Sequence, residues 1–86
     1  MQRWSPEIIR YLYTAADHSR YYQDLARQLG AFLRPEDRVC DAGCGLGLLS
    51  RALLPYCAHV TAVDRSPAAV AALRARGEDP KLSALT

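Results

Sequence analysis

The 86-residue chain is long enough for one small domain, with half of its residues hydrophobic and 23% charged, a balance typical of a globular protein. Its net charge of +2 is spread evenly, so charge gives no support for binding to nucleic acid or to a membrane surface. No apolar run approaches the roughly 18 residues of a membrane-spanning helix, and the first residues lack the apolar core of a secretory signal. The odd number of cysteines fits a reducing compartment, so we expect a cytoplasmic protein.

The first predicted helix begins at Ser5 and Pro6, because serine is a favoured N-cap and proline suits the first helical position. Apolar residues then recur at helical spacing, at Ile8, Leu12 and Ala15 or Ala16. We expect residues 17–19 to break this helix, since aspartate or serine can cap the next one.

The second predicted helix has a clearer apolar stripe, formed by Tyr22, Leu25, Leu29 and Phe32. Residues 35–37 then turn the chain, so residues 1–36 form a predicted N-terminal helical segment. Six of the seven aromatic residues lie within the first 32 residues. The simpler interpretation is that Tyr22 and Phe32 pack the second helix onto a sheet. The alternative makes Trp4, Tyr11 or Tyr13 part of a lid over a ligand.

Strands and helices alternate in residues 37–86. Strands are predicted at residues 38–41 and 59–64, and the beginning of a third at residues 82–86. Helices are predicted at residues 48–54 and from Ser66–Pro67 to a stop at Gly77. Because this alternation calls for parallel strands joined by right-handed crossovers, the predicted fold class is α/β.

A glycine-rich loop, Asp41-x-Gly43-x-Gly45-x-Gly47, joins the first predicted strand to the helix after it. Glycines here let the backbone turn tightly and let a ligand approach, while the helix N-terminus offers unpaired N–H groups. Asp64 ends the next strand about 20 residues later, where an acid can accept hydrogen bonds from ribose hydroxyls. The order of loop, helix, strand and acid predicts a nucleotide-type cofactor site.

The spacing of the glycines separates two classes of cofactor. A dinucleotide fingerprint, Gly-x-Gly-x-x-Gly, would place its third glycine at position 48, which is Leu48. The third glycine is Gly47 instead, and Asp41 precedes the loop. A carboxylate there would repel a pyrophosphate but suits the ammonium and sulfonium groups of S-adenosylmethionine. An NAD-binding oxidoreductase fragment is therefore the second choice.

This pattern resembles the first motif of class I S-adenosylmethionine-dependent methyltransferases, and the likeness extends over roughly residues 20–86. The resemblance implies a Rossmann-like fold, of which residues 37–86 supply the first part. In this family the loop backbone contacts the methionine part of the cofactor, the acid holds the ribose, and the next residue lies beside adenine. The cofactor-binding residues that it implies are Asp41, Ala42, Gly43, Cys44, Gly45, Gly47, Asp64 and Arg65. Arg65 departs from the usual apolar residue, and its guanidinium would stack on adenine or point into solvent.

Compared with the seven-stranded sheet of that family, the sequence accounts for two strands and the start of a third. We therefore expect an incomplete fold whose first strand has an open edge, covered by the rest of a longer protein, by an oligomer or by a partner. We expect a fragment that binds the cofactor weakly and is inactive alone, with a small molecule as the acceptor. A non-catalytic, methyltransferase-like subunit completed by a partner is the remaining alternative. The catalytic residues stay unassigned.

The cysteines do not predict a metal site. Cys40, Cys44, Cys57 and His59 lack the Cys-x-x-Cys pair typical of structural zinc sites. We expect buried free thiols at all three cysteines and no bound metal.

Overall fold

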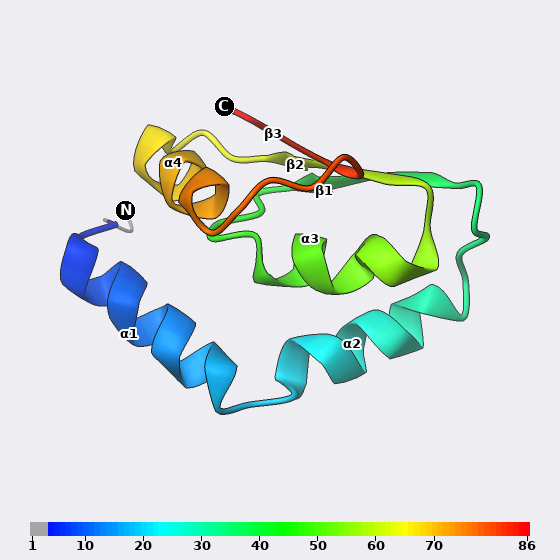
Figure 1. Ribbon diagram of the computed structural model, residues 1–86, viewed down its shortest axis with the longest axis horizontal. Helices are drawn as coiled ribbons and strands as arrows, with labels where there is room; N and C mark the ends of the chain where they lie inside the picture. Colours follow the sequence, from blue (N-terminus) through cyan, green and yellow to red (C-terminus); the bar gives the residue numbers. More distant parts are fainter. Residues whose placement is uncertain (1–3) are drawn as a thin grey trace.

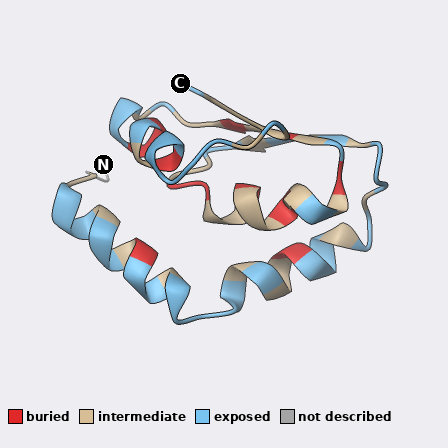
Figure 2. Cartoon of the chain, viewed as in Figure 1, coloured by how far each residue is buried: buried red, intermediate tan, exposed pale blue. Residues whose placement is uncertain are grey.

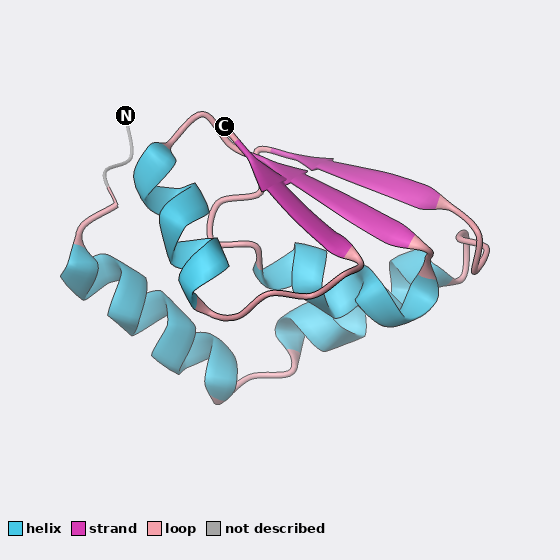
Figure 3. Ribbon diagram, turned by 45° about the horizontal axis from the view of Figure 1, so that its top comes forward, coloured by secondary structure: helices cyan, strands magenta, loops and turns pink. Residues whose placement is uncertain are grey.

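The computed structural model of the chain describes residues 4–86, so the first three residues of the predicted N-terminal segment lie outside it. Its elements are α1 (Pro6–Asp17), α2 (Tyr21–Gly30), β1 (Arg38–Ala42), α3 (Leu48–Leu53), the short 3₁₀ helix η1 (Leu54–Tyr56), β2 (His59–Val63), α4 (Pro67–Ala75) and β3 (Leu82–Leu85). The strands form one parallel sheet in the order β1-β2-β3, and their three arrows point the same way in Figure 3. The predicted α/β fold, with its third strand, is confirmed.

The helices lie on one side of the sheet in two layers (Figure 1). α3 packs between the sheet and α2, while α4 follows β2 and contacts β3. Because each strand pairs with the next along the chain, right-handed crossovers place α3 and α4 on the same face. The loops that follow β1 and β2 therefore meet at one end of the sheet.

The predicted start of the first helix is confirmed. Ser5 is the N-cap of α1, and its Oγ accepts a hydrogen bond from the Ile8 N–H at 3.1 Å. The predicted break after Asp17 is confirmed as well, where the Ser19 Oγ accepts from the Tyr21 N–H at 3.1 Å. The buried residue of α1, however, is Tyr13 rather than a member of the apolar series that begins at Ile8.

The predicted packing of the second helix is wrong for Phe32, whose side chain is 87% exposed. Two features explain this. α2 ends at Gly30, so Phe32 lies in the following turn, and α3 separates α2 from the sheet. The fully buried residue of α2 is Ala26, which packs beside Leu53 and Cys57.

Burial alternates from residue to residue along β1 and β2, and Figure 2 colours the chain by burial. Val39 and Val60 are paired in register on the face covered by helices, and they pack in one hydrophobic cluster. Cys40 alternates to the opposite face and is exposed, so the prediction of a buried thiol is wrong there. The cause is the arrangement of helices, because within residues 4–86 none covers that face.

A second hydrophobic cluster lies where α1, the glycine loop and α4 meet. Its buried members are Tyr13, Leu46 and Ala69, and Trp4 is among the partly buried residues that pack against it. Gly77 follows α4 with a positive φ of 127°, which confirms the predicted glycine stop. This cluster fixes the N-terminal helices beside the end of the sheet where the glycine loop lies. The division into two segments at residue 36 stays a prediction.

Among the helices that the structure describes, none has the length and apolar character needed to cross a membrane.

Candidate functional site

The glycine loop leaves β1 through backbone conformations that favour glycine. Gly43, Gly45 and Gly47 have φ values of 71°, 56° and 76°, which L side chains rarely adopt. The N–H groups of Gly43 and Cys44 donate to the Val63 carbonyl oxygen at 2.7 and 2.9 Å. The loop is therefore held against the end of β2, as the order of elements in the sequence predicts.

Asp64 joins the loop after β1 to the loop after β2. Its Oδ2 accepts a hydrogen bond from the Gly45 N–H at 2.8 Å, and its Oδ1 accepts from the Ser66 N–H at 2.9 Å. An ionised carboxylate offers about four acceptor positions, so about two remain for other donors. The half-buried Asp64 is thus oriented by the backbone and still able to accept hydrogen bonds from a ligand.

Asp41 lies below the loop in a defined orientation. Its Oδ2 accepts a hydrogen bond from the Oγ of Ser50, a fully buried residue of α3, at 2.6 Å. Cys44 lies near both carboxylates. Burial, followed by the charges of Asp41 and Asp64, raises the pKa of the Cys44 thiol to about 11. The end of the loop is therefore a negatively charged environment that favours a cationic ligand.

Two cavities adjoin the glycine loop. The larger, about 770 Å³, is lined by Trp4, Gly43, Gly45, Asp64, Arg65, Ser66 and Pro67. The smaller, about 270 Å³, is lined by Trp4, Leu12, Tyr22, Asp41, Gly43, Cys44, Gly45, Leu46, Leu48 and Leu49. Because Trp4, Gly43 and Gly45 line both, the cavities meet along the loop. One end carries Asp64 and the other carries Asp41.

Trp4, which precedes α1, packs over the glycine loop at Gly45. A Cβ built on Gly45 would lie 3.5 Å from Cζ2 and 3.7 Å from Cη2 of the indole ring. Of the three aromatic residues considered for a lid, Trp4 lies over the loop, while Tyr11 is 67% exposed and Tyr13 is buried against Leu46. Trp4 was absent from the predicted binding residues, since nothing local in the sequence tells where the N-terminus lies.

The structure brings together most of the predicted site residues. Those that line the two cavities are Asp41, Gly43, Cys44, Gly45, Asp64 and Arg65, the last with an exposed side chain. Ala42 and Gly47 do not line them. Gly47 is the buried N-cap of α3, and a Cβ there would lie 2.1 Å from Leu73 Cδ1 of α4. The third glycine of the motif is thus explained by packing between the loop and α4.

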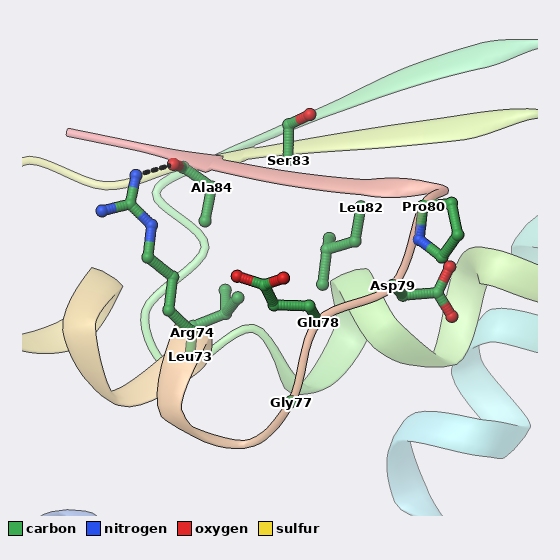
Figure 4. A pocket seen from close by; sticks show the side chains of 9 residues that line it. All are labelled: Leu73, Arg74, Gly77, Glu78, Asp79, Pro80, Leu82, Ser83 and Ala84. Carbon is green, nitrogen blue, oxygen red and sulfur yellow. Dashed lines mark hydrogen bonds between the residues drawn. The ribbon is translucent and has the colours of Figure 1, made fainter.

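A further cavity of about 520 Å³ lies beneath β3, and no residue of the glycine loop lines it (Figure 4). Arg74 reaches across it, and its Nη2 donates to the Ala84 carbonyl oxygen at 2.5 Å. Asp79 also lines this cavity, and its Oδ1 accepts from the Lys81 N–H at 2.8 Å. The predicted cofactor residues do not line this cavity.

Within residues 4–86, no group of three or more histidine, cysteine, aspartate or glutamate side chains is arranged to hold a metal ion. Cys40, Cys44 and Cys57 are free thiols, of which Cys57 is buried as predicted while Cys44 is only half-buried.

The raised pKa of Cys44 predicts a low reactivity toward iodoacetamide. Because thiolate is the reactive form, a pKa of about 11 leaves about one thiol in a thousand ionised at pH 8. We expect mass spectrometry at pH 8 to find alkylation at the exposed Cys40, with Cys44 reacting only as the pH approaches 11. In urea all three cysteines should react. Equal rates for Cys40 and Cys44 in the folded chain would contradict the raised pKa of Cys44.

Comparisons with known proteins agree with this geometry. The sequence profile of a family described as "Methyltransferase domain" matches residues 39–86. Over 40 residues the chain is 52% identical to ubiquinone biosynthesis O-methyltransferase of Xylella fastidiosa (strain 9a5c), a match that covers 46% of this chain and 16% of that enzyme. Carboxy-S-adenosyl-L-methionine synthase of Dichelobacter nodosus (strain VCS1703A) is 41% identical over 56 residues, or 62% of this chain and 24% of that enzyme.

The fold is similar to that of CalS10, an amino pentose methyltransferase from Micromonospora echinaspora whose structure contains bound S-adenosylmethionine. The TM-score is 0.68 at 21% identity, and the match covers 99% of this chain and 36% of CalS10. The chain spans about a quarter or less of the length of the two curated relatives. Since the profile matches more than half of the chain and includes the glycine loop and Asp64, the chain belongs to the methyltransferase-domain family of class I S-adenosylmethionine-dependent methyltransferases.

Proposed function

We propose that the two adjoining cavities bind S-adenosylmethionine, and that the chain forms the cofactor-binding part of a methyltransferase. The observation that carries this proposal is the position of Asp64 between the two loops, with acceptor capacity left over. The family relationship also supports the choice of cofactor, because the family is assigned from the sequence and does not depend on the shape of the cavities.

The larger cavity suits the adenosine part of the cofactor. Asp64 lies in its wall, oriented by two backbone N–H groups, and ribose hydroxyls are suitable donors to its remaining acceptor positions. Gly43 leaves space for a ligand, since a Cβ built on it would meet no atom within 4 Å. Arg65 and Pro67 line the same cavity, where adenine would lie.

The smaller cavity suits the methionine part of the cofactor, which carries an ammonium group and the sulfonium. Asp41 lies in its wall, and the pKa of Cys44 in the same wall is raised by burial first and then by the charges of Asp41 and Asp64. Opposite charges attract strongly where water is partly excluded, so the cationic end is favoured here over a pyrophosphate. We therefore place the positive end of the cofactor beside Asp41.

When bound, S-adenosylmethionine supplies an activated methyl group, so the protein's task is to bind and orient it. In this chain the glycine loop and the two aspartates would hold the cofactor, and Trp4 would limit access of water above Gly45. We propose a small molecule as the methyl acceptor, since one relative is named for ubiquinone biosynthesis and CalS10 for an amino pentose. We also propose that strands from a longer chain or a partner cover the outer edge of β1.

A titration of the ¹⁵N-labelled chain with S-adenosylhomocysteine, followed by NMR, tests the proposal and tolerates weak binding. We expect saturable shifts of the Gly43, Gly45 and Asp64 amides, together with quenching of Trp4 fluorescence. NADH serves as the control ligand and should cause no saturable shift. Saturable binding of NADH without binding of S-adenosylhomocysteine would contradict the proposal and favour an oxidoreductase. A stable oligomer that binds neither ligand would favour a non-catalytic subunit.

A further inference from the structure

Besides Trp4, which precedes α1, a residue of α1 itself contacts the glycine loop. The Tyr13 hydroxyl donates a hydrogen bond to the Leu46 carbonyl oxygen at 3.0 Å, across 33 positions of sequence. Leu46 follows Gly45 and lines the smaller cavity. Tyr13 and Leu46 are only 8% and 4% exposed, so this bond is shielded from water. A buried carbonyl needs a donor, and Tyr13 supplies one.

The Tyr13 ring is covered by Arg76, which is in turn paired with Asp17. The guanidinium carbon of Arg76 lies 4.0 Å from the centre of the Tyr13 ring, and the Arg76 Nη2 is 3.2 Å from the Asp17 Oδ1. These contacts join the end of α1 to the residue that follows α4. The Arg76–Asp17 pair is largely exposed, so its contribution to stability is small and its main effect is to orient the ring.

We propose that Tyr13 is a positioning residue of the cofactor site. Its hydroxyl fixes the Leu46 carbonyl, and through it the turn from Gly43 to Leu46 that forms one wall of the smaller cavity. The inference rests on the proposed function, because it concerns how tightly the loop holds the methionine end of the cofactor. Asp64, at the other end, is held by the Ser66 N–H as well as by the Gly45 N–H, and since Ser66 lies outside this turn, its position depends less on the Leu46 carbonyl.

The variant Tyr13→Phe removes the donor and keeps the ring beneath Arg76. The Leu46 carbonyl then lacks its buried donor, and we expect the affinity for S-adenosylhomocysteine to fall roughly ten-fold. Adenosine would occupy only the cavity that carries Asp64, so its affinity should change less than about two-fold. A general loss of folding would weaken both ligands alike, which separates a positioning role from a merely structural one.

The test is an NMR titration of the 86-residue chain and its variants with both ligands. Tyr11→Phe is the matched control, since Tyr11 is an exposed tyrosine of the same helix. The Gly47 amide, which shares a peptide group with the Leu46 carbonyl, should shift in Tyr13→Phe and not in the control. Arg76→Gln provides a second variant that keeps the hydroxyl and should give a smaller loss with the same selectivity.

Four outcomes distinguish the inference from the proposed function. If the unsubstituted chain binds neither ligand, the proposed function fails and the inference falls with it. If that chain binds S-adenosylhomocysteine and folded Tyr13→Phe binds it equally well, the inference alone is overturned. An equal loss for both ligands also overturns it. If Tyr13→Phe does not fold, Arg76→Gln provides the test. An equal loss of affinity for both ligands overturns the inference, and a larger loss for S-adenosylhomocysteine than for adenosine supports it.

Discussion

The Asp64→Asn substitution is expected to weaken binding of S-adenosylhomocysteine by about 100-fold, because a hydrogen bond to a charged group contributes more than one between neutral groups. One carboxylate oxygen becomes an NH₂ group, which cannot accept a hydrogen bond from a ribose hydroxyl. That NH₂ also meets a backbone donor, either the Gly45 N–H or the Ser66 N–H, where an acceptor is needed. Unfolding in urea should therefore show a loss of about 1–3 kcal/mol in stability.

The matched control for Asp64→Asn is Asp79→Asn. Asp79 accepts from the Lys81 N–H, two residues along the chain, just as Asp64 accepts from the Ser66 N–H. It lines the cavity beneath β3, which no residue of the glycine loop lines (Figure 4). We expect Asp79→Asn to leave the affinity for S-adenosylhomocysteine unchanged. Equal affinities for Asp64→Asn and the unsubstituted chain would remove the main support for the cofactor site.

The Gly47→Ala substitution is expected to lower the free energy of unfolding by about 3 kcal/mol, the sum of backbone strain and overpacking. The φ of 76° is unfavourable for a residue with a Cβ, and that Cβ would lie 2.1 Å from Leu73 Cδ1. Leu73 Cγ would lie only 2.6 Å from the same Cβ, so more than the tip of this side chain would have to shift. Urea denaturation followed by circular dichroism measures the loss.

Gly43→Ala separates the two causes. Gly43 has a similar φ of 71°, but a Cβ there would meet nothing within 4 Å. We expect Gly43→Ala to lower the free energy of unfolding only by the cost of backbone strain, about 1–2 kcal/mol. In the double variant with Leu73→Ala, the additional cost of Gly47→Ala should largely disappear, because the clashing methyl group is removed. If Gly43→Ala and Gly47→Ala destabilise the chain equally, the close contact with α4 is not the reason for the third glycine.

Local signals in the sequence predicted much of the fold and of the site. The serine cap before Pro6, the glycine stop at Gly77 and the third strand each depend on neighbouring residues, and each is confirmed. The positive φ values of the glycine loop belong to the same class, because a side chain at those positions would be strained. Asp64 reaches the loop because parallel strands bring their carboxyl ends to one edge of the sheet.

The remaining features depend on contacts between distant parts of the chain. Phe32 and Cys40 are exposed because of where the helices lie, and no local pattern states that. Trp4 lies over Gly45, and Tyr13 reaches Leu46, only because α1 folds back across the end of the sheet. Hydrophobic periodicity identified a helix there, but it did not tell which residues of α1 would approach the loop.

The pairing of each strand with its neighbour along the chain has a consequence for how the protein is made. The glycine loop, α3, β2 and Asp64 form one continuous stretch of chain. The part of the candidate site from the glycine loop to Asp64 therefore requires no distant segment of the sequence. Contacts between nearby residues form quickly, because little chain entropy is lost in closing short loops. We expect this part of the site to be among the first to assemble during synthesis. The strands would then join the sheet in the order in which they are translated.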